Sequence, residues 1–338
     1  MKTTNRIEWL DLMRGLAAMA IVVYHFHVFL GLSHTGYAVV AVDMFFALSG
    51  IVLALKYTDS ILGGMGPLEF AGARLRRLYP MVLIAGLFIV ALNFARIPSG
   101  THMLATDTDA WTVLLVTPLP RIPAGAFPPD PPMWSFWAEL AANAVWFAVL
   151  KAGRRWMVPL GVASMAIIVV VALRMNTLNV GWEVGLMFRL ASLARALAWF
   201  CVGYAIAMRD IGLRASIAVL LALLAAFVAA VRAGHGHEGL NELLAASVSV
   251  ALLNVAYRLP APPRYLGTAS RWLGMVSFPL YLMHSPAGRL LPYFDFMAPW
   301  AALLLVVGGA TVGATMLNEA AVKWVNKVYR SRVSPAVT

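Results

Sequence analysis

One apolar stretch near the start of the sequence carries the side chains of acid–base chemistry. Asp11 and Arg14 precede its long apolar part, "GLAAMAIVVYHFHVFLG", and His25 lies within it. On an α-helix, the step from Arg14 to His25 returns to within about 20° of the same face and rises roughly 16 Å. Placing Asp or Arg at membrane depth costs roughly 2.5–3.5 kcal/mol each on insertion scales. This stripe is therefore a candidate functional site.

The residue types in this stripe suit group transfer to a hydroxyl. Histidine titrates near neutral pH and can take a proton from an attacking hydroxyl, and arginine holds phosphate groups in a fixed fork geometry. We expect His25 to act as a general base, and Arg14 to bind a donor phosphate or to organise the site. A structural alternative is open at this point: Asp11 and Arg14 pair to join helices, and His25 bonds a backbone carbonyl.

Further polar residues recur at the ends of other apolar runs. Toward one end of the predicted bundle lie two acids and a histidine: Asp43 in "VDMFFALSG", which Ser49 follows, Glu139 in "WSFWAEL" and His284 in "FPLYLMHSP". Toward the other end lie Arg74, Arg76 and Arg77 in "ARLRRLYP". Arg195 lies within the apolar run "LARALAWFCVGYAIA". This layout predicts a phosphate-bearing donor at the basic end and an acceptor hydroxyl at the other. Helix packing or interfacial anchoring is the alternative for each residue, and Arg76 fits anchoring best.

The elements that must position these groups are transmembrane helices. Hydrophobic residues make up 61% of the 338 residues and charged residues 12%, with a mean hydropathy of +0.79. Soluble domains carry about 25% charged residues. We therefore predict an all-α, polytopic membrane protein, a bundle of about ten transmembrane helices. The apolar runs of suitable length lie at about 9–30, 38–55, 80–95, 134–150, 156–173, 190–208, 215–231, 239–257, 272–288 and 298–318.

The net charge of +11 indicates membrane orientation rather than nucleic-acid binding. With a cytoplasmic N-terminus, eighteen Lys and Arg residues fall on the inner side of the predicted spans and six on the outer side. This bias places both termini in the cytoplasm. Asp11 and Arg14 interrupt the first run ahead of the cleavage-site-like "AMA", so we expect a retained helix rather than a signal peptide.

The remaining segments predict one membrane-embedded domain over 1–318 and a basic cytoplasmic tail over 319–338. Two longer connections are expected, at 57–79 and at 96–133. The second is rich in Pro and has the length of functional lids or disordered spacers.

No metal or soluble-enzyme motif is evident. His235 and His237 on a Gly-rich loop offer too few ligands, so we expect no metal, and there is no HExxH, P-loop or GxSxG pattern. The single cysteine, Cys201, excludes an intrachain disulfide and is expected to pack between helices.

Together these stretches resemble the acyltransferase-3 family of integral membrane O-acyltransferases over nearly the whole chain. Arg14 and His25 match its arginine–ten residues–histidine motif, and "VDMFFALSGIVLA" is similar to its VDxFFxLSGFxL stretch. "ARLRRLYP" resembles its RxxR element, with Arg74 and Arg77 in the paired positions. "MWSFWAEL" matches its WSLxxE element up to Leu140, where the family usually has a second acid. "VSFPLYLMHSP" resembles its SYxLYLxHxP stretch, with Pro279 in place of a small or polar residue.

The resemblance implies transfer of an acyl group, most often acetyl, from cytoplasmic acyl-CoA to a hydroxyl of an extracytoplasmic or lipid-linked carbohydrate. It implies that His25 leads the catalysis, with Arg14, Arg74 and Arg77 on the donor side and a bacterial cytoplasmic membrane as the location. Some relatives carry a fused esterase-like domain, for which this chain has no room. A partner in envelope-glycan assembly is therefore one expectation.

Two mechanisms and a rival function remain open from the sequence. His25, aligned by Asp43 or Glu139, deprotonates the acceptor directly, or the acyl group passes through His25 or Ser49. The rival is a secondary transporter for an anionic solute that uses the same intramembrane groups. Transporters usually contain paired repeats, whereas the charged first helix occurs once here. A scaffold or sensor would leave these charges unexplained.

Overall fold

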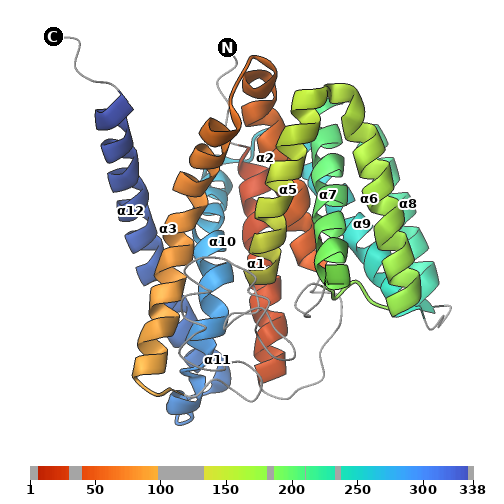
Figure 1. The fold of residues 1–338 in the computed structure, drawn as a ribbon. Coiled ribbons are helices and arrows are strands. Elements are labelled where there is room, and N and C mark those ends of the chain that lie inside the picture. Colours follow the sequence, from red (N-terminus) through yellow and green to blue (C-terminus); the bar gives the residue numbers. More distant parts are fainter. Residues whose placement is uncertain are drawn as a thin grey trace. The chain divides into compact units, whose positions relative to one another are not determined.

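The structure, a computed structural model, describes residues 7–29, 40–97, 133–180, 186–209, 211–232 and 237–333, and these contain helices and no β-strand. The long helices are α1 (Glu8–Phe29), α2 (Ala41–Leu62), α3 (Pro67–Phe94), α5 (Met133–Ala152), α6 (Met157–Met175), α7 (Leu186–Met208), α8 (Leu213–Arg232), α9 (Glu238–Arg258), α10 (Arg264–Gly288) and α12 (Gly309–Val333). Shorter segments are η2 (Arg154–Trp156), η3 (Leu291–Phe294), α11 (Pro299–Leu303) and the π-helical η4 (Leu304–Gly308) (Figure 1).

The predicted all-α membrane bundle is confirmed. Among the described residues, nine helices are long and apolar enough to cross a membrane. They correspond to nine of the ten predicted spans. The tenth run, 272–288, lies in α10, whose 25 residues make it about 37 Å long. Helix α10, whose sequence includes the polar stretch "RYLGTASRWLG", is not among the nine.

The connection expected at 57–79 is mostly helical, so that expectation was wrong. Helix α2 continues to Leu62 and α3 begins at Pro67, with a turn between them in which Gly64 has a φ of 115°. Hydropathy detects only the part of a helix that lies in hydrocarbon, and polar turns at the helix ends escape it. The predicted connection at 96–133 lies, except for 96, 97 and 133, outside the described residues.

Contacts divide the helices into two units. The first comprises residues up to Met65 and from Trp134 to Ser277. Within it, α2 packs along α7 at two glycines (Figure 1). A Cβ added to Gly50 would lie closer than 3.0 Å to the Phe200 backbone, and one added to Gly203 equally close to the Ala47 carbonyl. Small residues of this kind let membrane helices approach closely.

Basic side chains close the C-terminal ends of two helices in this unit. Lys151 on α5 donates to the carbonyls of Ile61 and Met65 at the end of α2, at 3.2 and 3.3 Å. Arg258 on α9 donates to the carbonyls of Ile206 and Arg209 at the end of α7, at 2.9 and 2.6 Å. The last carbonyls of a helix lack intrahelical donors and carry partial negative charge, which a cation stabilises.

The second unit comprises Gly66 to Met133 and the chain from Phe278 onward. Helix α3 packs beside α12 in this unit (Figure 1). Arg289, just after α10, donates from both terminal nitrogens to Asn93 Oδ1 at 3.1 Å and also to the carbonyl of Ile97, which closes the end of α3. Helix α12 runs without a break past residue 319, so the residues expected as a basic tail continue the last helix as far as Val333.

Candidate functional site

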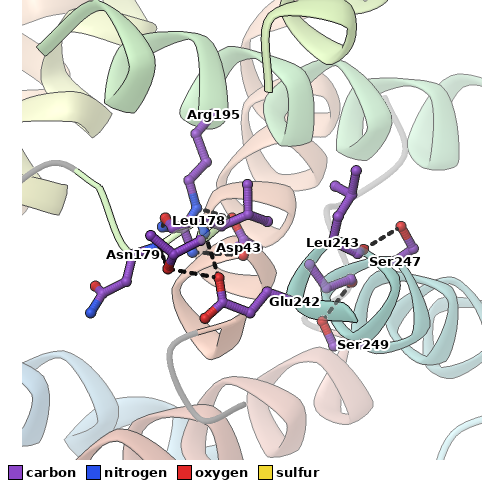
Figure 2. A network of polar contacts seen from close by, with 10 residues as sticks. Asp43, Leu178, Asn179, Arg195, Glu242, Leu243, Ser247 and Ser249 are labelled. Atoms are coloured by element: carbon purple, nitrogen blue, oxygen red, sulfur yellow. Dashed lines mark hydrogen bonds and ion pairs between the residues drawn. The ribbon is translucent and has the colours of Figure 1, made fainter. Parts of the chain in front are cut away.

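The most deeply buried charges of the first unit are a bidentate ion pair between α7 and α2. Arg195 Nε donates to Asp43 Oδ1 at 2.6 Å and Nη2 donates to Oδ2 at 2.8 Å, and both residues are 0% exposed (Figure 2). Asp43 lies in the first turn of α2, where the helix dipole favours an anion. The guanidinium carbon also lies 5.6 Å from the centroid of the Trp134 ring on α5. Arg195 therefore joins three helices.

A third buried charge, Glu242 on α9, extends this pair to the turn between α6 and α7. Arg195 Nη1 donates to the Leu178 carbonyl, and the Leu178 N–H donates to Glu242 Oε2 (Figure 2). Thr177 Oγ1 donates to the same carboxylate oxygen at 3.0 Å. Both main-chain polar groups of Leu178 are thus held by side chains of opposite charge, which fixes the turn against α2, α7 and α9.

Sequence reasoning missed Glu242. The sequence did indicate it, because Glu242 is an acid within the apolar run "NELLAASVSV". An acid inside a predicted span is a candidate site residue, and Asp43 was selected by the same criterion. The partner at Leu178 left no signal, since a main-chain group can bind a side chain whatever residue carries it.

Ser49 and Glu139 form a second polar pair, between α2 and α5. Ser49 Oγ donates to Glu139 Oε1 at 2.9 Å, and both residues are partly exposed. Ser49 precedes Gly50, whose close approach to Phe200 fixes this turn of α2. Asn143 donates to the Glu139 carbonyl at 2.7 Å, one turn further along α5. The structure therefore pairs a hydroxyl with a carboxylate that could accept its proton.

His25 is held in one tautomer by its own helix. Its Nδ1 lies 3.1 Å from the Ile21 carbonyl, and His27 makes the same contact with Val23 at 3.0 Å. A carbonyl only accepts, so Nδ1 carries the proton, and in the neutral ring Nε2 then carries the lone pair. The Tyr24 ring packs edge-on against the imidazole, with centroids 5.2 Å apart.

Asp43 binds Arg195 with both of its carboxylate oxygens, and its expected role in aligning His25 stays a prediction. Glu139 remains the predicted partner of His25.

Arg14 lies in a bridge between α1 and α10. Its Nη2 donates to Asp11 Oδ1 at 2.8 Å and to the Gly274 carbonyl at 2.5 Å. The side chains of Arg14 and Asp11 are 25% and 10% exposed. The pairing of Asp11 with Arg14, expected from their spacing of one turn, is therefore present, and it reaches a second helix.

The three arginines of α3 have different environments in the second unit. Arg74 is buried, with 4% exposure, and Arg77 is exposed. The Arg76 guanidinium carbon lies 3.8 Å from the centroid of the Tyr329 ring on α12. Arg76 therefore contacts α12. Its interfacial anchoring stays a prediction, as does the donor role predicted for Arg74 and Arg77.

His284 is buried near the end of α10, with 2% exposure. Its Nδ1 lies 2.7 Å from the Tyr281 carbonyl and 3.2 Å from that of Leu280. Its ring thus has the same local arrangement as His25, with Nδ1 against the backbone of its own helix.

The contacts described above join candidate residues in pairs. Within the first unit these pairs are Asp43 with Arg195, Ser49 with Glu139, and Arg14 with Asp11. In the part of the chain that the structure describes, no group of three or more His, Cys, Asp or Glu residues could hold a metal ion. His235, considered with His237 as a metal ligand, lies outside the described residues. The groups present suit proton transfer and anion binding.

Comparison with known proteins covers nearly the whole chain. A family model described as "Acyltransferase domain" (Acyl_transf_3) matches residues 7–319. "Protein 2 in picA locus" of Rhizobium radiobacter is 36% identical over 157 residues, which cover 42% of this chain and 81% of that protein. No solved structure matches.

Proposed function

The chain belongs to the acyltransferase-3 family, and from this premise we propose that it transfers an acyl group, most simply acetyl, from acyl-CoA to a hydroxyl of an extracytoplasmic or lipid-linked carbohydrate. The membership supports a membrane acyltransferase. The donor, the acyl group and the acceptor are our proposals.

The observation that carries this proposal is the contact of His25 Nδ1 with the Ile21 carbonyl, at 3.1 Å, which favours the tautomer with the proton on Nδ1. With the Nδ1 proton directed at the Ile21 carbonyl, Nε2 can accept a proton from the acceptor hydroxyl. The hydroxyl oxygen then attacks the thioester carbonyl, the C–S bond breaks, and the CoA thiolate takes the proton from His25. In the two-step alternative, His25 or Ser49 carries the acyl group between donor and acceptor, and Glu139 takes the proton of Ser49.

The donor would bind through its phosphates at the basic start of α3. Arg74 and Arg77 can hold phosphate oxygens in fork geometry. Arg76 is engaged with Tyr329, so we give it the weaker part in donor binding. We assign Arg14 to organising the site. Arg195 and His284 would act on the substrate side, Arg195 through the turn that it holds at Leu178.

The membrane placement follows from the charge pattern. A bacterial cytoplasmic membrane, with both chain termini in the cytoplasm, would put the donor arginines on the side where acyl-CoA is present. The acceptor would then meet His25 from the other side. Envelope-glycan assembly proteins are the partners that this arrangement suits, and the lipid bilayer surrounds the bundle.

The test compares envelope and secreted glycans by mass spectrometry in cells that lack the protein. These cells are complemented with wild type, His25→Ala or His27→Ala, with each protein measured in the membrane fraction. His27→Ala is the matched control, because His27 makes the same contact with its own helix two residues further on.

We expect an acyl increment with wild type and His27→Ala and none with His25→Ala. Restoration by His25→Ala would overturn the assignment of the base. Absence of CoA release by the purified wild-type protein given acetyl-CoA and a glycan extract would favour the transporter.

A further inference from the structure

The N-terminal part of α1 lies very close to the first half of α10. Glu8, Asp11 and Gly15 share one face of α1, and Gly267 and Gly274, two turns apart, share one face of α10. A Cβ on either α10 glycine would lie closer than 3.0 Å to the facing carboxylate, Glu8 for Gly267 and Asp11 for Gly274. These helices therefore meet through acids on one side and bare backbone on the other.

Polar contacts join the same two segments. Arg271 on α10 pairs with Glu8, and Trp9 Nε1 donates to the Pro260 carbonyl, just before α10, at 2.7 Å. Arg14 lies deepest along α1 and makes the contact that reaches the α10 backbone, at the Gly274 carbonyl. Ser277 Oγ donates to this same carbonyl at 2.9 Å.

The second hydrogen bond of Arg14 is the informative one. Arg14 and Asp11 lie one turn apart on α1, so their ion pair needs no contact with another helix. The bond to Gly274 instead ties the α1 side chain to the main chain of another helix, and a charged donor makes it stronger than a neutral bond. Asp11 receives the same Nη2 and so holds the guanidinium in the orientation that reaches α10.

We propose that Asp11, Arg14 and Gly274 form a positioning bridge that sets α1, and with it His25, in its reacting geometry. The inference rests on the proposed transfer function. His25 lies roughly 16 Å further along the same helix, and a rigid helix carries a displacement at one end to the other. Arg14 thus acts through the placement of α1 rather than by binding the phosphates of the donor.

The two roles of Arg14 give opposite kinetic signatures. Loss of a phosphate ligand weakens donor binding and raises the donor KM. Loss of a positioning contact leaves donor affinity in place and lowers kcat, because small misplacements of reacting groups are costly. Substitutions of Asp11 and of Arg14 should then both lower kcat, although only the arginine could attract a phosphate.

The experiment measures CoA release by the purified full-length protein in detergent, over a series of acetyl-CoA concentrations, with an envelope-glycan extract as acceptor. The variants are Arg14→Gln, Arg14→Lys and Asp11→Leu, the last of which removes the oxygen that accepts from Arg14. Lysine keeps the positive charge, but its ammonium nitrogen lies one bond closer to the main chain than Nη2 of arginine does. Arg271→Gln is the control, because it removes the neighbouring, more exposed α1–α10 ion pair without touching Arg14. Gel filtration and thermal unfolding check that each variant folds.

We expect Arg14→Gln and Arg14→Lys to lower kcat on the order of 100-fold, with Asp11→Leu falling in the same direction and Arg271→Gln near wild type. A donor KM that rises less than about fivefold supports the bridge, and a larger rise overturns it. Kinetics of Asp11→Leu like those of wild type also overturn it. If Arg14→Gln does not fold, Asp11→Leu decides, because leucine is similar in shape to aspartate and has no oxygen to accept from Arg14. If the wild-type protein releases no CoA, the proposed function fails and the bridge loses its role.

Discussion

Arg195 on α7 holds both carboxylate oxygens of Asp43 on α2, at 2.6 and 2.8 Å, and neither side chain is exposed. Removing one partner of such a pair leaves an uncompensated buried charge, which costs about 3–5 kcal/mol. We therefore expect Asp43→Asn and Arg195→Met each to lower the thermal unfolding temperature of the purified protein markedly. The double variant Asp43→Leu/Arg195→Met should recover part of the loss, since it buries no unpaired charge. Single variants as stable as wild type would show that the pair is not formed.

The contact between α2 and α7 predicts a second loss of stability. A methyl group at Gly50 meets the Phe200 backbone, and one at Gly203 meets the Ala47 carbonyl. Neither neighbour is a flexible side chain that could move aside, so we expect Gly50→Ala and Gly203→Ala to destabilise by about 1–3 kcal/mol through overpacking. Gly313→Ala on α12 is the control, because a Cβ there meets nothing within 4 Å. Equal unfolding temperatures for Gly50→Ala and Gly313→Ala would contradict the close packing.

An isosteric substitution of Glu139 can test its catalytic contribution separately from its hydrogen bond with Ser49. In Glu139→Gln the amide oxygen still accepts from Ser49 Oγ, so stability should stay near that of wild type. Loss of the carboxylate should lower turnover about 100-fold or more if it takes part in proton transfer. CoA release in a purified assay measures the effect. Undiminished turnover would leave Glu139 a packing residue, and full activity of Ser49→Ala would exclude Ser49 as the acyl carrier.

The arginines of α3 predict two different phenotypes from similar changes. Arg77 is exposed, so Arg77→Gln should raise the donor KM with little effect on stability. Arg76→Gln removes the stacking on Tyr329, a contact worth about 0.5–1 kcal/mol at a partly exposed site, and should raise the donor KM less than Arg77→Gln does. A donor titration and a thermal unfolding series on both variants compare them. A donor KM that rises for Arg76→Gln but not for Arg77→Gln would contradict the assignment of donor binding to Arg77.

The sequence was sufficient for the membrane architecture and for local pairs. Apolar runs predict spans because the length of a run is set by the hydrocarbon thickness, and nine of the ten matched. Asp11 and Arg14 could be paired from their spacing on one helix.

The long-range partners could not be predicted in this way. Asp43 and Arg195 are 152 positions apart, and nothing in either local sequence identifies the other. The same holds for Ser49 and Glu139, 90 positions apart. Gly274 left no signal, since its contribution is a main-chain carbonyl. Helix packing decides such contacts, and one sequence read alone contains no record of it.

The separation of Asp43 from Arg195 also has a consequence for how the protein is made. Domains are synthesised at about 5–20 residues per second, so α2 leaves the ribosome roughly 8–30 s before the arginine that neutralises its acid. During that time, Asp43 near the start of α2 must stay hydrated at the membrane surface or be sheltered by the insertion machinery. The arrival of α7 then supplies the arginine that pairs with this acid. The pair can thus form only once the sixth predicted span has been made, and a truncation before Arg195 leaves Asp43 without this partner.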